Sequence, residues 1–219
     1  MADLYRTLSS DLLVDASILA LRRDRISTAT GEATREVVEH FGAAAVAAVR
    51  GGGENREVLL IRQYRRPVGR YLWELPAGIL DLVGEDPLTG AQRELAEEAG
   101  VAASTWHLLG DIATSPGTSE EICRIFLAED VRPLTAQESD ALPEAEGEEA
   151  DMTHRWVPVA EAVDMVRRGE VENSIAVAGL LHLAVGTRRE VTEPFAKTSA
   201  LSDRRSVGQE PGTDMKHVR

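Results

Sequence analysis

The order of apolar and polar positions along the chain predicts alternating strands and helices. Short apolar stretches over residues 12–41, interrupted by a turn at 29–32, predict a small β meander. Residues 42–49 are rich in alanine, but glycines at 51–53 end the run and a clear strand follows, so a hairpin is expected. Further strands are predicted at 72–75, 106–113, 122–128 and 155–157, and helices at 87–99, 158–168 and 174–185.

Two segments differ in composition from the rest. Residues 138–151 hold seven acidic residues and no lysine or arginine, which predicts a solvated loop. Beyond Gly186 the chain is polar, with scattered proline and glycine, and no packed core is expected there. The predicted organisation is a meander at 1–41, one α/β domain at 42–186, and a disordered tail at 187–219. Deletion of residues 190–219 should change neither activity nor melting temperature.

Composition narrows the classes of function. A length of 219 residues with 43% hydrophobic content can bury one sizeable core. The single cysteine, Cys123, excludes an internal disulfide framework and a cysteine-rich zinc site, and fits a reducing compartment. Because no apolar run approaches the roughly 20 residues needed to span a bilayer, a cytoplasmic location and no membrane partner are expected. The net charge of −13 disfavours nucleic acid as a partner, so a polyanionic substrate would need local cations or a metal.

The predicted helix at 87–99 concentrates carboxylates on one face. Glu94, Glu97 and Glu98 stand at positions i, i+3 and i+4, while the apolar positions of the helix project to the other side. Like charges at this spacing repel each other by about 0.2–0.5 kcal/mol per pair on an isolated helix. By itself such a run is more often a solvated acidic surface than a site. If it is a site, its hard oxygen ligands suit Mg²⁺ or Mn²⁺.

The residues around this run resemble the Nudix box. The box is a glycine, a glutamate and then R-E-U-x-E-E-x-G-U, where U is apolar, and it corresponds here to Gly78, Glu85, Arg93, Glu94, Leu95, Glu97, Glu98, Gly100 and Val101. Six residues separate Gly78 from Glu85 where the usual pattern has five, which changes the loop but not the helix. The resemblance implies an α/β fold, the Nudix α/β/α sandwich with a mixed sheet, preceded here by the small antiparallel meander.

Further motifs resemble the ADP-ribose pyrophosphatase branch of the Nudix hydrolases. They are R-E-V-V-E-H at 35–40, Q-Y-R at 63–65, W-E-L-P-A-G at 73–78 and S-P-G at 115–117, with Pro116 sixteen residues after Gly100. This resemblance implies metal-dependent hydrolysis of ADP-ribose to AMP and ribose 5-phosphate. Two alternatives stay open: a Nudix hydrolase of another nucleoside diphosphate sugar, such as a GDP-sugar, and an ADP-ribose-sensing regulator. The intact box glutamates disfavour the regulator.

The same resemblance assigns roles to residues. The backbone carbonyl of Ala77 and the carboxylates of Glu94 and Glu98 are expected to hold Mg²⁺ or Mn²⁺, with Glu97 assisting and Arg93 orienting the glutamates. Guanidinium groups match phosphate oxygens, which makes Arg35 and Arg65 candidates for substrate contact. The substrate-binding set is completed by Pro116, Gly117 and Glu121, with Glu120 as the alternative to Glu121.

A general base is expected outside the helix, because the proton affinity of a carboxylate that coordinates a metal is lowered by the cation. By the resemblance, Glu149 in the acidic loop takes this role, with Glu148 and Glu146 as alternatives. Members of the branch are commonly dimers, so the resemblance also implies a homodimer in which the meander could serve as the dimerisation element.

Overall fold

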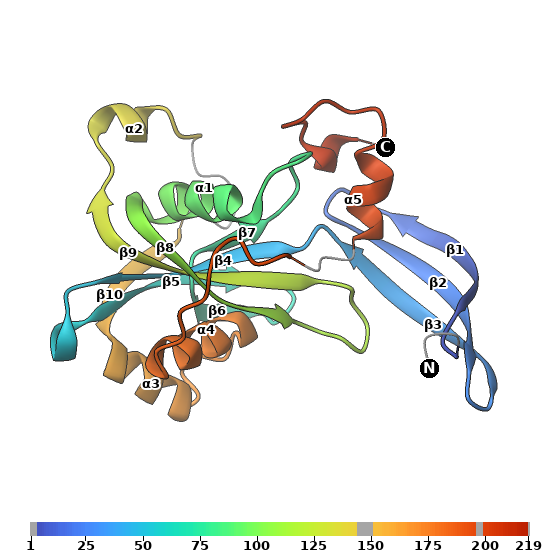
Figure 1. Cartoon of the computed structure of the whole chain (residues 1–219), viewed down its shortest axis with the longest axis horizontal. Coiled ribbons are helices and arrows are strands. Elements are labelled where there is room, and N and C mark those ends of the chain that lie inside the picture. The colour runs from blue at the N-terminus through green and yellow to red at the C-terminus, as the bar shows by residue number, and fades with distance from the viewer. Residues whose placement is uncertain (1–3, 144–150, 196–198, 219) are drawn as a thin grey trace.

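A small antiparallel sheet lies beside a larger α/β body in the computed structural model, which describes residues 4–143, 151–195 and 199–218 (Figure 1). The small sheet has the order β1-β2-β3. Its strands are β1 (Thr7–Asp15), β2 (Leu19–Thr28) and β3 (Gly31–His40). The predicted meander is therefore confirmed, and it leads into the body through residues 41 and 42.

The body contains a mixed sheet of seven strands in the order β10-β5-β4-β9-β8, with β6 paired to β5 and β7 paired to β4. The strands are β4 (Ala43–Arg50), β5 (Glu57–Arg65), β6 (Arg70–Glu74), β7 (Ala77–Ile79), β8 (Val101–Ala113), β9 (Ile122–Pro133) and β10 (Thr153–Pro158). Only the β4–β9 pair among them is parallel. The alanine-rich β4 is central and buried on both faces, and its small side chains let helices approach from both sides.

Helices cover both faces of this sheet, as expected for an α/β/α sandwich (Figure 1). Helix α1 (Pro87–Ala99) packs against one face, and α3 (Val159–Arg167) and α4 (Ser174–Ala184) pack against the other. Alternate residues of β4 contribute to the two cores: Ala45 faces the α4 side and Val46 faces the α1 side. The predicted bounds of α1 agree with the structure because its end signals are strong. Asp86 accepts a hydrogen bond from the N–H of Leu88 at 2.9 Å, and Gly100 takes the left-handed conformation at φ 64°.

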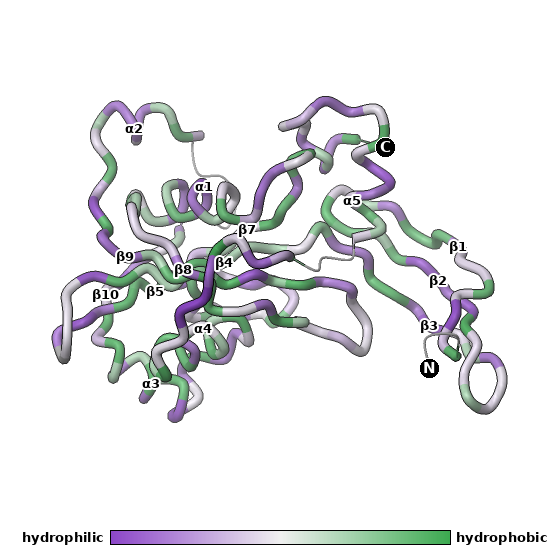
Figure 2. Tube along the Cα trace, viewed as in Figure 1, coloured by the Kyte–Doolittle hydropathy of each residue, from purple (hydrophilic) through white to green (hydrophobic). Residues whose placement is uncertain are grey.

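The prediction that residues 187–219 form a disordered tail is wrong for the described part of this segment. Its described part contains helix α5 (Ala200–Arg205) and the short 3-10 helix η3 (Met215–His217), and Leu201 and Met215 are almost fully buried. In Figure 2, isolated hydrophobic positions interrupt this largely hydrophilic segment. The prediction failed because only a few apolar anchors hold the segment, and their contacts lie on distant parts of the chain, which local periodicity does not reveal.

The acidic segment is partly helical. Helix α2 (Ala136–Asp140) is capped at its N-terminus by Thr135, whose side chain forms a reciprocal capping box with Glu138. Residues 144–150 lie outside the described part of the chain. The thiol of Cys123 is buried in β9, and burial raises its pKa above the ordinary value. Within the described residues, every helix is too short or too polar to span a lipid bilayer.

Candidate active site

Strand β7 and helix α1 bring the predicted metal-binding residues together. The backbone N–H of Ala77 donates a hydrogen bond to Oε2 of Glu98 at 2.8 Å. A Cβ placed on Gly78 would lie 2.0 Å from the carboxyl carbon of Glu94, so a side chain at this position would displace this carboxylate. Residue 78 of the box therefore acts by its missing side chain, which lets a strand backbone and two helix carboxylates share one small volume.

The guanidinium of Arg93 connects three box glutamates. Its Nη1 donates to Oε1 of Glu94 at 2.6 Å and to Oε2 of Glu97 at 3.1 Å. Its Nε and Nη2 donate to the two carboxylate oxygens of Glu85 at 3.1 and 3.3 Å. Because one planar cation holds carboxylates from the loop and from the helix, it fixes their relative positions and offsets their mutual repulsion.

Burial raises the pKa of Glu94 to about 7; the guanidinium of Arg93 opposes this rise, while the negative charges of Glu97 and Asp81 add to it. A buried carboxylate with raised proton affinity is a place where a further cation would be stabilising. In the described part of the chain, no three histidine, cysteine or acidic side chains converge as a complete metal-ligand set. The candidate centre instead combines two carboxylates with the backbone of β7, and these hard oxygen donors fit a divalent cation.

A pocket of about 410 Å³ lies where β3 meets the loop after β8. It is lined by Arg35, Glu36, Val37 and residues 116–120, and so it contains three residues of the predicted substrate-binding set. Two backbone hydrogen bonds join the two walls: the N–H of Val38 donates to the carbonyl of Thr118 at 2.8 Å, and the N–H of Glu120 donates to the carbonyl of Val38 at 3.1 Å. The small sheet is therefore attached directly to the loop that carries Pro116.

Arg65 and Glu121 lie outside the pocket that Arg35 lines, and each has partners of its own. Arg65 forms a two-pronged ion pair with the buried carboxylate of Glu74, at 2.7 and 3.0 Å, and so holds the W-E-L-P-A-G segment. Glu121 accepts a hydrogen bond from the hydroxyl of Thr114, and its Oε1 lies 3.6 Å from Nδ1 of His40. Neither residue lines the pocket around Arg35.

The alternative to Glu121, Glu120, lines the pocket but its carboxylate is already engaged. It accepts hydrogen bonds from Nη1 of Arg22 and from the N–H of Ala200, each at 2.9 Å. Sequence analysis did not single out Arg22 because two of its three partners, Glu39 of strand β3 and Glu120 of the loop after β8, lie far away in the sequence. An arginine in a meander carries no local signal of such a contact.

The predicted base, Glu149, and its alternatives Glu146 and Glu148 lie outside the described residues. The structure does describe Asp151, which follows them. The hydroxyl of Tyr71 in β6 donates to Oδ2 of Asp151 at 2.5 Å, and the guanidinium of Arg62 lies 4.8 Å from the centre of the Tyr71 ring. The acidic segment is thereby anchored beside the β5–β6 hairpin. Sequence analysis missed Tyr71, because its partner lies 80 residues away.

Comparison with known proteins adds independent evidence. Residues 40–177 match the family model described as the NUDIX domain. The chain is 49% identical over 198 residues to an ADP-ribose pyrophosphatase of Mycobacterium tuberculosis, covering 90% of this chain and 89% of that protein. It is 35% identical over 130 residues to an ADP-ribose pyrophosphatase of Bacillus subtilis, covering 59% and 68%. A solved structure described as an ADP compounds hydrolase shares the fold, with a TM-score of 0.67 at 20% identity over 83% of this chain and 92% of the other.

Proposed function

Because the chain belongs to the NUDIX family, we propose that it hydrolyses the pyrophosphate bond of ADP-ribose in a metal-dependent reaction, giving AMP and ribose 5-phosphate. The observation that carries this proposal is the arrangement of the box, in which Arg93 and its glutamates surround the backbone of Ala77 and Gly78. The relatives named ADP-ribose pyrophosphatase support the choice of substrate. An intact acidic cluster supports a hydrolase over a regulator that only senses ADP-ribose.

The residues proposed to hold the metal are Glu94, Glu98 and the backbone carbonyl of Ala77, with Glu97 at the edge of the cluster. Mg²⁺ is the proposed ion, and Mn²⁺ has the same preference for oxygen ligands. When bound, a divalent cation neutralises the pyrophosphate oxygens and lowers the pKa of a water molecule. The chain's own contribution is to hold the ligands still: Arg93 fixes Glu94 and Glu97, and the N–H of Ala77 fixes Glu98.

The proposed substrate site is the pocket beside β3. Arg35 stands at its wall with Pro116 and Gly117, and a guanidinium there can pair with a phosphate or contact the adenosine end of the substrate. A protein of net charge −13 needs such a local cation to accept a dianionic ligand. Arg65 is proposed as the second arginine that contacts the substrate. Glu121 is proposed as the contact to the terminal ribose.

Proton removal from the attacking water is assigned to Glu149. The carboxylates of the helix are proposed to hold the metal, and a bound cation would lower their proton affinity, which makes them poor bases. The segment that carries Glu149 follows helix α2 and precedes Asp151, which accepts a hydrogen bond from Tyr71. Groups that act on bound substrate often come from such connecting segments.

An assay of AMP release tests the proposed function. With Mg²⁺ or Mn²⁺ present, ADP-ribose is expected to be cleaved with a higher kcat/KM than a GDP-sugar, and excess EDTA is expected to abolish the activity. Preference for the GDP-sugar would leave the reaction type intact but replace the substrate. Binding of ADP-ribose without any release of AMP would favour the sensing regulator.

We also propose that the protein is a homodimer formed through the small sheet. Most exposed large apolar side chains of the described chain lie within residues 4–18, including Leu8, Leu12 and Val14 of β1. Strand β1 is an edge strand of its sheet, with β2 as its strand partner among the described residues, and all nine of its residues are exposed. An apolar sheet edge of this kind favours pairing with another strand, and a second copy of β1 offers a self-complementary partner about a two-fold axis.

Sedimentation tests this assembly. The wild-type chain is expected to sediment at twice its mass of 23.8 kDa, and Leu12→Glu is expected to shift it towards the monomer because it places a charge within the apolar strand. Val185→Glu is the matched control: Val185 is 79% exposed after helix α4, in the body, so this change should leave the dimer intact. A wild-type chain that sediments as a monomer would contradict the proposal.

A further inference from the structure

The end of the chain pairs with the loop inside the Nudix box. The N–H of Gly212 donates to the carbonyl of Val83 at 2.8 Å, and the N–H of Val83 donates to the carbonyl of Thr213 at 3.0 Å. The N–H of Met215 donates to the carbonyl of Asp81 at 2.8 Å. These bonds form a short antiparallel ladder, so the loop between Gly78 and Glu85, which is one residue longer than usual, is held by a segment far away in sequence.

The same segment brings a lysine to a buried carboxylate. Asp81 is only 3% exposed, and Nζ of Lys216 lies 2.6 Å from its Oδ2. Within the described residues, this oxygen accepts no hydrogen bond of good geometry, so the ammonium group is what compensates its charge. The negative charge of Asp81 contributes to the raised pKa of Glu94, and the positive charge of Arg93 acts against protonation of Lys216. The Asp81–Lys216 pair therefore lies beside the acidic cluster of the box.

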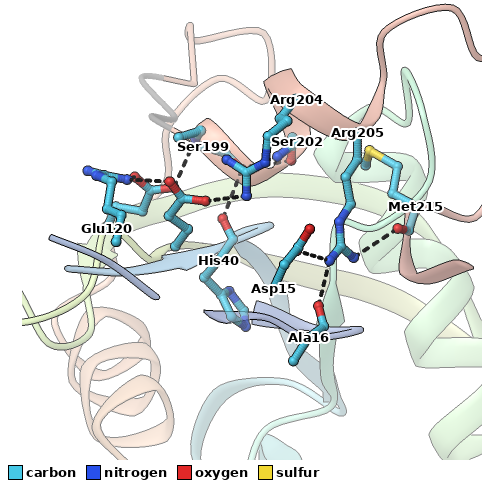
Figure 3. A network of polar contacts seen from close by, with 12 residues as sticks. Asp15, Ala16, His40, Glu120, Ser199, Ser202, Arg204, Arg205 and Met215 are labelled. Atoms are coloured by element: carbon cyan, nitrogen blue, oxygen red, sulfur yellow. Dashed lines mark hydrogen bonds and ion pairs between the residues drawn. The ribbon is translucent and has the colours of Figure 1, made fainter. Parts of the chain in front are cut away.

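Helix α5, which precedes Lys216 in the chain, joins the body to the small sheet (Figure 3). Arg205, almost fully buried, donates to the carbonyls of Ala16 and Ser17 at 2.5 and 2.6 Å and to Oδ1 of Asp15 at 2.6 Å, all at the turn between β1 and β2. It also donates to the carbonyl of Met215 at 3.1 Å, which ties α5 to the last turn.

Apolar contacts follow the same route as these polar ones. Leu201 and Met215 share a buried cluster with Ala20 and Phe41, against which Ile79 and Val83 of the box loop also pack. One cluster thus contains residues of the small sheet, of the C-terminal segment and of the box. The position of the box loop is therefore coupled to contacts that residues 199–218 make with the small sheet.

We propose that residues 199–218 belong to the catalytic unit and that Lys216 is a positioning residue for the box carboxylates; the proposal rests on the metal-dependent hydrolysis proposed above. Without Lys216, the carboxylate of Asp81 stays buried without compensation, and a buried unpaired charge is strongly unfavourable. The loop must then move to expose Asp81, or Arg93 must turn towards it. Either change moves the guanidinium of Arg93 away from its hydrogen-bond partners Glu85, Glu94 and Glu97.

The test compares four full-length chains with the wild type. Lys216→Met keeps much of the side-chain length but removes the charge, Lys216→Arg keeps the charge, and Lys216→Met with Asp81→Asn removes both charges. His217→Gln is the matched control, because His217 lies on the same turn and its side chain is 83% exposed. Hydrogen–deuterium exchange of residues 79–85 is measured on the metal-free proteins, and kcat, KM and the metal concentration for half-maximal activity are measured separately.

Lys216→Met is expected to speed exchange at residues 79–85, to lower kcat on the order of tenfold and to raise the metal requirement, with a smaller effect on KM. Lys216→Arg and the double variant should recover both exchange and kcat, because in each of them Asp81 is either paired or neutral. His217→Gln should match the wild type. A Lys216→Met chain that matches the wild type in exchange and kinetics overturns the role of Lys216, as does a double variant that recovers nothing. A wild type that releases no AMP refutes the proposed function, while the exchange data still test the contact.

Truncation before Gly212 tests the ladder itself. It removes the three backbone bonds, Lys216 and the buried side chain of Met215, so the melting temperature should fall by several degrees and exchange at residues 79–85 should rise. An unchanged melting temperature together with unchanged exchange would show that the segment contributes nothing to the box.

Discussion

Replacing Glu98 by glutamine is expected to lower kcat by about 100-fold or more, because the change removes a charge from the metal centre and, with it, a few kcal/mol of transition-state stabilisation. The fold should survive this change. The amide oxygen of glutamine can still accept the hydrogen bond from the N–H of Ala77, which lies 2.8 Å from Oε2 of Glu98. The variant should therefore melt close to the wild type in the absence of metal.

The measurement combines kinetics with melting in increasing Mg²⁺. A ligand that binds only the folded state raises the melting temperature, so the wild type should gain stability with Mg²⁺ and Glu98→Gln should gain less. Glu161→Gln is a suitable control: it makes the same chemical change on α3, on the opposite face of the sheet, where Glu161 pairs with Arg168 at 2.8 Å. Activity of Glu98→Gln within about threefold of the wild type would refute the metal assignment.

The second large effect is expected at Glu149. Loss of a general base typically costs about 10²–10⁴ in rate, so Glu149→Gln should lower kcat strongly. Because this residue is proposed to remove a proton and not to hold the metal, KM and the gain in melting temperature with Mg²⁺ should change little. Glu98→Gln should affect that gain, so the two variants separate the two roles.

Neighbouring glutamates provide the matched comparison for this variant. Glu148→Gln and Glu146→Gln remove the same charge from the same acidic segment. If Glu148→Gln loses activity and Glu149→Gln keeps it, the base lies in this segment but at another residue. If all three variants keep the wild-type kcat, the base lies elsewhere in the protein.

Local sequence signals determined the elements that depend on local physics. Helix α1 was predicted with the bounds it has in the structure, since proline at its first turn and Gly100 at its end act within a few residues. The meander and most strands of the body followed from short apolar stretches between turn residues, whereas the three-residue strand β7 was not predicted. The spacing of Glu94, Glu97 and Glu98 placed three carboxylates on one helix face, because helix geometry fixes which positions share a side.

Only the tertiary structure decided how these elements meet. The sequence indicated that Gly78 belongs to the box, but its reason, the approach of Glu94 to a strand backbone, depends on the packing of α1 against β7. Arg65 matched a substrate-binding motif, yet in the fold it clamps Glu74 from the neighbouring strand. Composition described the C-terminal segment as a tail, although Arg205 and Lys216 reach partners up to 190 residues away. Such contacts leave no periodic trace in the sequence, because each consists of one side chain meeting one distant partner. The sequence by itself therefore determined the elements and the likeness to the family, while long-range packing decided which polar groups pair and which part of the chain supports the site.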